Sequence, residues 1–449
     1  MVFVQQHYYI RVTVLKLISF FVKNGPAILG LPTSQKLKVI TINVDTVEHM
    51  TVTMEHDDTD YYNNDKERQD SKKAKTNMMH DFNDVFQGVG CFAGECTIHL
   101  DPNVPPSVSP PRRIPVALQD PVKAELESME SQGIIASLAV DEPSEWCNSF
   151  VCASKSNGNL RFCLDPAKLN EAIIRPYHYT PTLEDVLPKL NGAKYFSILD
   201  ARSGYWNIKL DNKSSYYTTF ATPFGRYRFL RLPFGLSCSS DMFQKKIDET
   251  YGDMPQVTGI ADDLVIIGYD EDGADHDRNL KAFLERTREK GIKLNPDKCI
   301  IRCTRIPFYG MVTGANGLEP DPKKIKAIVD MKPPTCVKDL QSFLGVVNYL
   351  SGFSPYVAEL AAPLRKLLRT DSVFCWTPEY DRAFNAIKKE MASPKILKFF
   401  DAKKPVVLEV DSSGHGLGAA LMQPSDSNNY KSLKPVACAS KTLSDAETV

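Results

Sequence analysis

Two adjacent carboxylates, Asp262 and Asp263, interrupt an apolar run from Gly259 to Gly268. The run is rich in β-favouring residues and predicts two strands with the acids at the turn between them. Burying an unpaired carboxylate among such side chains costs on the order of several kcal/mol. Positive charge must therefore meet these acids, and a divalent cation is the simplest source. A solvated Asp-Asp hairpin turn is the competing interpretation.

A third carboxylate ends an earlier predicted strand. Residues 195–200 alternate like a half-buried strand whose last residue is Asp200. This strand and the later Asp-Asp hairpin can bring three carboxylates to one point. Two ions about 4 Å apart, bridged by these acids, would activate a primer 3′-hydroxyl and hold a triphosphate. The three acids therefore predict a two-metal nucleotidyl-transfer centre.

Further short motifs follow one another along the chain in a fixed order. They are Gly133-Ile134-Ile135, residues 158–165 with Leu169-Asn170, residues 196–205, Leu232-Pro233-Phe234-Gly235-Leu236, the Asp-Asp hairpin and Phe308-Tyr309-Gly310. In this ordered set the chain resembles the reverse transcriptase of gypsy-type long-terminal-repeat retrotransposons, whose fold is shared with retroviral reverse transcriptases. The resemblance covers residues 79–449 and, more weakly, 10–44. Ile260 departs from it, because the family usually has an aromatic residue at that position.

The resemblance implies an α+β, right-hand polymerase fold with fingers, palm and thumb, a helical connection and the start of a ribonuclease H-like α/β domain. The expected order is a retropepsin remnant (1–44), a polar linker (45–78), an extended lead-in segment (79–118), fingers and palm (119–318), thumb and connection (319–395) and a truncated ribonuclease H-like domain (396–449). Strand and helix periodicities in residues 195–318 independently fit an antiparallel sheet with helices on one face.

The resemblance also implies roles for single residues. Asp200, Asp262 and Asp263 would hold two Mg²⁺ ions, with Mn²⁺ as a substitute. Asp200 and Asp262 are the firmest metal ligands, since adjacent strand residues point to opposite faces and Asp263 would reach the ions less directly. The remaining positions are Lys155 and Arg161 at the triphosphate, Tyr205 as the steric gate against a 2′-hydroxyl, Phe234 at the nucleotide, and Phe308, Tyr309 and Gly310 as the primer grip.

Each of these roles has a plainer alternative. The cations Lys155 and Arg161 flank an Asn-Gly hairpin signal and would otherwise form a solvated basic hairpin. Tyr205 stands beside Trp206 and would otherwise be a core aromatic residue. The whole chain would otherwise be a non-catalytic nucleic-acid-binding remnant of a decayed retroelement.

The carboxy-terminal stretch resembles the opening of a ribonuclease H domain. Residues 405–411 predict a strand that ends at Asp411, which matches the first metal-binding carboxylate of that family. The chain ends at Val449, shortly after a helix start at Ser444. We therefore expect an incomplete site without ribonuclease H activity, and a sheet whose apolar face stays partly uncovered.

The amino-terminal residues carry weaker signals. Residues 10–44 look like the late part of a retropepsin, with an unrelated β-segment as the alternative. No Asp-Thr/Ser-Gly loop precedes residue 25, so we expect no protease activity. Residues 45–78 are polar and show no lasting period, which predicts a linker.

Charge and cysteine usage restrict the partners. The formal net charge of the 449 residues is −1, so phosphate contacts require local clusters of Lys and Arg. The 11 cysteines form no CxxC pair, and the apolar run 12–22 is too short for a membrane span. We expect an intracellular, cytoplasmic protein, within a virus-like particle in an intact element, that binds an RNA or DNA template with its primer and dNTPs. We expect no membrane contact, and the sequence does not indicate an oligomeric state.

Overall fold

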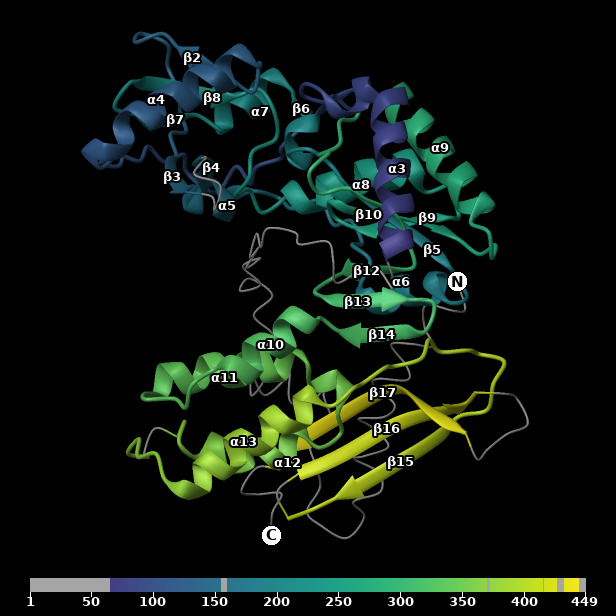
Figure 1. Cartoon of the computed structure of the whole chain (residues 1–449). Coiled ribbons are helices and arrows are strands. Elements are labelled where there is room, and N and C mark those ends of the chain that lie inside the picture. Colours follow the sequence, from purple (N-terminus) through teal and green to yellow (C-terminus); the bar gives the residue numbers. More distant parts are fainter. Residues whose placement is uncertain (1–64, 155–159, 370–371, 415, 426–431, 444–449) are drawn as a thin grey trace. The chain divides into compact units, whose positions relative to one another are not determined.

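The computed structural model describes residues 65–154, 160–369, 372–414, 416–425 and 432–443 (Figure 1). These residues form two compact units. The first unit comprises residues 65–182 and 193–304, and the second comprises residues 183–192 and 305–443. The predicted retropepsin remnant, residues 1–44, lies outside the described residues.

An antiparallel sheet of four strands forms the centre of the first unit, in the order β11-β5-β10-β9. Its strands are β5 (Tyr195–Asp200), β9 (Val257–Ile260), β10 (Asp263–Gly268) and β11 (Ile300–Cys303). The apolar run of β10 is buried from Leu264 to Gly268. A strand buried on both faces reads as a continuous apolar run, which explains the absence of alternation there.

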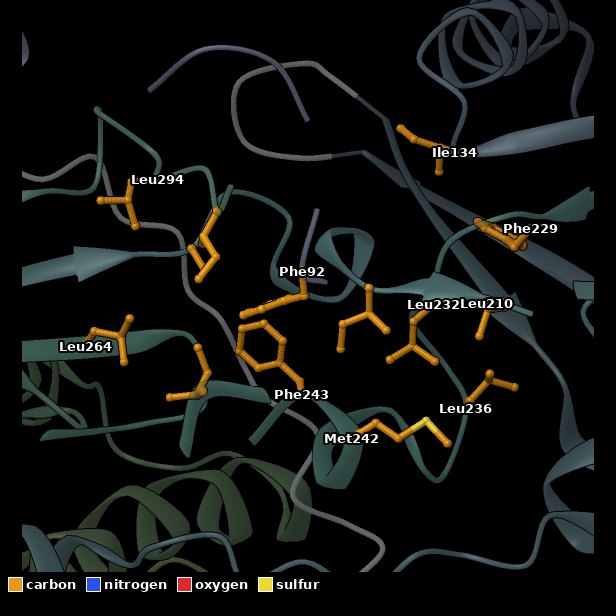
Figure 2. Close-up of a cluster of buried hydrophobic side chains, with 14 of the residues drawn as sticks. Phe92, Ile134, Leu210, Phe229, Leu232, Leu236, Met242, Phe243, Leu264 and Leu294 are labelled. Carbon is orange, nitrogen blue, oxygen red and sulfur yellow. The ribbon is translucent and has the colours of Figure 1, made fainter. Parts of the chain in front are cut away.

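Two helices with an apolar periodicity pack beside this sheet. Helix α8 (Ser239–Tyr251) buries Met242, Phe243 and Ile247, and α9 (Ala274–Glu289) buries Leu280, Phe283, Leu284 and Thr287. Both sets are those that helical spacing assigns to the inner face. Figure 2 shows Met242 and Phe243 in the core of the first unit. It also labels Phe92, Ile134, Leu210, Phe229, Leu232, Leu236, Leu264 and Leu294.

The rest of the first unit consists of short strands and helices around this core. A hairpin of β3 (Ser149–Ser154) and β4 (Leu160–Asp165) stands where the basic hairpin was predicted, and a separate sheet has the order β2-β8-β7. The other elements are η3 (Asn83–Phe86), β1 (Glu95–Cys96), α4 (Val116–Ser131), β2 (Ile135–Leu138), α5 (Ala167–Ala172), η4 (Gly204–Asn207), β6 (Lys209–Leu210), α7 (Asn212–Tyr217), β7 (Phe220–Thr222) and β8 (Gly225–Phe229).

The predicted linker is wrong for residues 65–78, because Asp65–Asp81 form helix α3. The helix packs on β11. Ser71 donates a hydrogen bond to the carbonyl of Ile301, and Lys75 donates one of 2.7 Å to the carbonyl of Cys299. Its buried residues are Ser71 and Met78, so the helix lacks the continuous apolar stripe by which a helix is usually found in a sequence.

The second unit combines two small sheets with helices. One sheet has the order β12-β13-β14 and the other β15-β16-β17. A helical core joins them, in which Phe343 and Phe384 lie 4.5 Å apart between ring centroids. The elements are α6 (Leu183–Leu190), β12 (Arg305–Phe308), β13 (Met311–Gly314), β14 (Gly317–Pro320), α10 (Pro322–Asp330), α11 (Val337–Tyr349), η5 (Ser351–Phe353), α12 (Val357–Lys366), α13 (Pro378–Ala392), β15 (Val407–Ser412), β16 (Gly416–Pro424) and β17 (Leu433–Thr442).

The carboxy-terminal sheet is more covered than its sequence suggested. Helix α12 packs against β16 and β17, and η5 packs against β17. Leu417, Ala419 and Leu421 of β16 are buried, whereas Val410 of β15 is 46% exposed. The expected uncovered apolar face is therefore smaller than predicted, because helices of the preceding segment cover part of β16 and β17. Within the described residues, no helix is long and apolar enough to cross a membrane.

Candidate active site

The Asp-Asp hairpin forms as predicted, and its register assigns each acid a place. Ile260 of β9 pairs with Asp263 of β10, so Ala261 and Asp262 form the turn. Ala261 has a φ of 54°, and its N–H donates a 3.1 Å hydrogen bond to Oε1 of Gln244 on α8. The carbonyl of Asp262 accepts a 3.3 Å bond from the N–H of Ala201. Two neighbouring elements thus fix the turn.

Asp200 lies directly opposite Asp263, because β5 and β10 pair in antiparallel register with these two residues as partners. Directly opposed residues of an antiparallel pair point to the same face of the sheet. Asp200 is buried, at 6% exposed, whereas Asp263 is exposed. The register thus favours Asp263 as the facing partner of Asp200. Because the strand begins at Asp263 and Asp262 belongs to the turn, strand alternation does not decide which of the two acids would reach an ion, and the assignment of Asp262 stays a prediction.

A lysine supplies the positive charge that the buried acid requires. Nζ of Lys298 lies 2.9 Å from Oδ2 of Asp200. Burial lowers the pKa of this ammonium, but the negative charges of Asp200, Asp263 and Asp262 outweigh burial and raise the pKa above its usual 10.5. The loop before Lys298 is also tied to the strand end, since the N–H of Asn295 donates a 2.9 Å bond to the carbonyl of Asp200.

The three acids suit a hard divalent cation by their chemistry, since carboxylate oxygens are the ligands that Mg²⁺ prefers. Among the residues that the structure describes, no three His, Cys, Asp or Glu side chains are grouped closely enough to hold a metal ion. At Asp200 the cation is the Lys298 ammonium. The chemistry of the three acids suits such an ion, while their arrangement in this structure is that of an acid paired with a lysine.

An aromatic cluster stands beside the acids. The ring of Tyr205 lies 4.8 Å from that of Phe234 and 5.5 Å from that of Phe243, between centroids. A Cβ added to Gly204 would lie 2.9 Å from Oδ1 of Asp262 and 2.9 Å from Cζ of Phe243. A glycine is required here because the acid and the ring approach its Cα so closely. The structure thus brings the predicted gate and the predicted nucleotide contact together, next to Asp262.

The turn that carries Phe234 is clamped by a side-chain amide. Asn170 donates 2.9 Å to the carbonyl of Gly235 and accepts 2.8 Å from the N–H of Ser237. Gly235 has a φ of 106°, and a Cβ there would lie 2.1 Å from the carbonyl oxygen of Leu164. These contacts fix the position of the Phe234 backbone relative to β4.

The other predicted residues belong to other elements, or the structure does not describe them. Lys155 lies outside the described residues, and for Arg161 the structure gives the backbone, which pairs with Ala153 between β4 and β3. In the second unit Phe308 is buried at the end of β12, and Tyr309 and Gly310 form the turn to β13. Asp411 is exposed on β15, and its carboxylate accepts a 2.9 Å bond from the N–H of Ser412. Asp411, Glu359 and Glu409 line one pocket of about 110 Å³.

Sequence reasoning missed three residues that support the acids: Lys298, Gln244 and Gly204. A strand that buries an acid indicates that a cation must be near, but it does not say which one. Gln244 interrupts the apolar face of α8 and is 2% exposed, and a buried amide in a helix is a usable signal of a bonded partner. The requirement for Gly204 comes from contacts far along the chain.

Two successive segments of this chain match two family profiles. The profile described as "Reverse transcriptase (RNA-dependent DNA polymerase)" matches residues 154–345. The profile described as "RNase H-like domain found in reverse transcriptase" matches residues 376–449. The two matches stand in the predicted order.

The Transposon Tf2-3 polyprotein of Schizosaccharomyces pombe is 31% identical over 295 residues, which cover 65% of this chain and 22% of that polyprotein. The chain thus spans less than a quarter of its curated relative.

Solved structures share the fold at low sequence identity. The foamy viral protease-reverse transcriptase dRH in complex with double-stranded DNA has a TM-score of 0.75 at 20% identity, covering 87% of this chain and 67% of that one. The same protease-reverse transcriptase in complex with an RNA/DNA hybrid has a TM-score of 0.72 at 20% identity, covering 87% and 52%. The predicted right-hand polymerase fold is confirmed. Residues 154–345 therefore resemble a reverse transcriptase domain, and residues 376–449 resemble the ribonuclease H-like domain found in such proteins.

Proposed function

We propose that this chain is an RNA-directed DNA polymerase of a gypsy-type retrotransposon. The observation that carries the proposal is the register that sets Asp200 opposite Asp263, beside the Asp262 turn, within a domain of the reverse transcriptase family. Its substrates are a primed RNA or DNA template and deoxynucleoside triphosphates. Complexes of the foamy viral enzyme with double-stranded DNA and with an RNA/DNA hybrid support the choice of nucleic acid.

In the proposed reaction the primer 3′-oxygen attacks the α-phosphorus and pyrophosphate leaves. Asp200, Asp262 and Asp263 would hold two Mg²⁺ ions, or Mn²⁺ in their place. The ions supply charge neutralisation and a more acidic 3′-hydroxyl. Lys298 supplies positive charge beside the buried carboxylate of Asp200 in the folded chain.

The aromatic cluster would select and orient the nucleotide. Tyr205, packed edge-on against Phe243 and against Phe234, offers a ring that would clash with a 2′-hydroxyl and admit a deoxyribose. Lys155 and Arg161 would neutralise the triphosphate from the β3–β4 hairpin, because charge develops on the leaving pyrophosphate.

The remaining assignments are also part of the proposal. They are the primer grip at Phe308–Gly310, a ribonuclease H carboxylate at Asp411, the domain boundaries given above other than those of the linker, a retropepsin origin for residues 1–44 and an intracellular place of action. Free, mostly covered cysteines support the last of these.

Primer extension on poly(rA)/oligo(dT) with Mg²⁺ tests the function. We expect dTTP incorporation by the wild-type chain and none by Asp200→Asn. A chain that binds the duplex but never extends it would instead be the non-catalytic remnant of a retroelement, a reading that Ile260 in place of the family's aromatic residue favours.

A further inference from the structure

The turn between β12 and β13 has a strained backbone. Phe308 pairs with Met311, which leaves Tyr309 and Gly310 as a two-residue turn. Their φ angles are 51° and 69°. Positive φ at both central residues is the pattern of a type I′ turn, which favours asparagine and glycine. A tyrosine persists in the left-handed region where surrounding contacts hold it there.

Two helices of the same unit supply such contacts. Oη of Tyr349, at the end of α11, donates a 2.7 Å hydrogen bond to the carbonyl of Tyr309. Nζ of Lys324, on α10, lies 3.8 Å from the centroid of the Tyr349 ring. A Cβ at Gly310 would lie 2.4 Å from Oη of Tyr349 and 2.2 Å from Nζ of Lys324. The turn is thus seated against both side chains.

The chemistry of this surface suits a nucleic acid. Tyr309 and Tyr349 are each 46% exposed, so aromatic faces reach solvent. Burial lowers the pKa of the Lys324 ammonium while Asp321 opposes that effect. The ammonium is half-buried against Tyr349 and helps to order that ring. Cations and aromatic rings in one place are the usual elements of a surface that binds a nucleic-acid strand.

We propose that Tyr349 and Lys324 are positioning residues that fix the β12–β13 turn, and that this turn positions the primer 3′ end. This inference rests on the proposed function, in which residues 308–310 grip the primer. Tyr349 acts through the carbonyl of Tyr309, and Lys324 acts through the ring of Tyr349. Neither needs to touch the reacting atoms.

The first test measures how well the backbone of the β12–β13 turn is ordered. Tyr349→Phe removes the hydrogen bond and keeps the ring. Tyr356→Phe is the matched control, since Tyr356 lies in the same unit and is 51% exposed. Hydrogen–deuterium exchange of a peptide spanning residues 305–314 should accelerate about three- to tenfold in Tyr349→Phe, the effect of one hydrogen bond. Tyr356→Phe should exchange there like the wild type.

The second test reads the primer end. With saturating dTTP on poly(rA)/oligo(dT), Tyr349→Phe should slow extension about three- to tenfold and leave the Kd for the duplex within about twofold, since one lost hydrogen bond misplaces the end without removing phosphate contacts. Lys324→Met should act in the same direction. Lys324→Arg, which keeps a cation over the ring, should restore most of the rate.

Three results would overturn the inference: unchanged exchange and extension in Tyr349→Phe, an equal loss in Tyr356→Phe, or weaker duplex binding that accounts for the whole rate loss. A wild-type chain that fails to extend primers refutes the proposed function and the primer role together. Exchange still decides in that case whether Tyr349 holds the turn.

Discussion

Replacing Lys298 with methionine removes the ammonium and keeps most of the side-chain volume. The change leaves Asp200, whose side chain is 8% exposed, without the cation 2.9 Å away. Removing one partner of a fully buried ion pair costs about 3–5 kcal/mol, most of which is the penalty of the charge left behind. The Lys298 side chain is 42% exposed, so solvent screens the pair and the cost must be reduced. We expect a loss of about 1–2 kcal/mol in the free energy of unfolding of the first unit.

Urea unfolding measured by tryptophan fluorescence can isolate that unit. Of the three tryptophans, Trp146 and Trp206 belong to the first unit and Trp376 to the second. A Trp376→Phe background therefore reports on the unit that holds the pair. Lys290→Met is the matched control, because the Lys290 side chain is 43% exposed and pairs at 3.5 Å with Glu289, which is 67% exposed. Its effect should stay within about 0.5 kcal/mol.

Two further measurements separate electrostatics from lost packing. In Asp200→Asn/Lys298→Met the destabilisation should shrink, since the buried carboxylate is gone. Mg²⁺ should stabilise Lys298→Met more than the wild type, because the ion meets no competing ammonium; binding at ten times Kd adds about 1.4 kcal/mol. Equal Mg²⁺ stabilisation of both proteins, or a Lys298→Met loss no larger than that of Lys290→Met, would refute this account of the site.

The pair also predicts a pH dependence. The pKa of Lys298 is raised above 10.5 in the folded chain. Its contribution is therefore fully present below the unfolded pKa and is lost as pH rises through the folded pKa. The stability difference between wild type and Lys298→Met should hold at neutral pH and disappear in strongly alkaline buffer. If the stability difference between the two proteins stays constant through that pH range, it comes from packing alone.

Four other variants test the site and its support. Asp200→Asn should lower primer extension by about a hundredfold or more while duplex binding persists, and a near wild-type rate would exclude Asp200 as a metal ligand. Tyr205→Val should raise ribonucleotide relative to deoxynucleotide incorporation about tenfold, and unchanged selectivity would leave Tyr205 a core residue. Gly204→Ala, whose Cβ would lie 2.9 Å from Oδ1 of Asp262, should cost about 1–3 kcal/mol and slow extension, which unfolding and rate measurements check. Ser71→Ala should cost about 1 kcal/mol by urea unfolding, because the carbonyl it bonds loses a donor, and no change would show that α3 does not support β11.

The local sequence pattern was enough to predict the elements that bury an apolar face. The helices α8 and α9 bury the apolar faces that their periodicity marks, and the hairpin at Asp262 forms where its turn was predicted. The family resemblance gave Tyr205 and Phe234 separate roles at the nucleotide, but it did not specify the contact between their rings, since nothing in the spacing of two aromatic residues specifies a shared surface. Lys298 is one of 54 Lys and Arg residues, and its pairing with Asp200 is set by tertiary register. Sequence could require a cation there but could not name it.

Helix α3 shows why the contacts that support the site could not be predicted from the sequence. β11 is an edge strand of the central sheet and begins two residues after Lys298. An edge strand presents unpaired backbone groups that a protein must cover. Ser71 and Lys75 of α3 bond to carbonyls at and beside this strand, and Glu67 accepts a 2.8 Å bond from the N–H of Thr304 just beyond it. A polar helix far upstream therefore bonds to backbone groups at and beside the edge strand that follows Lys298, and such bonds require the polar composition that made the segment resemble a solvated linker.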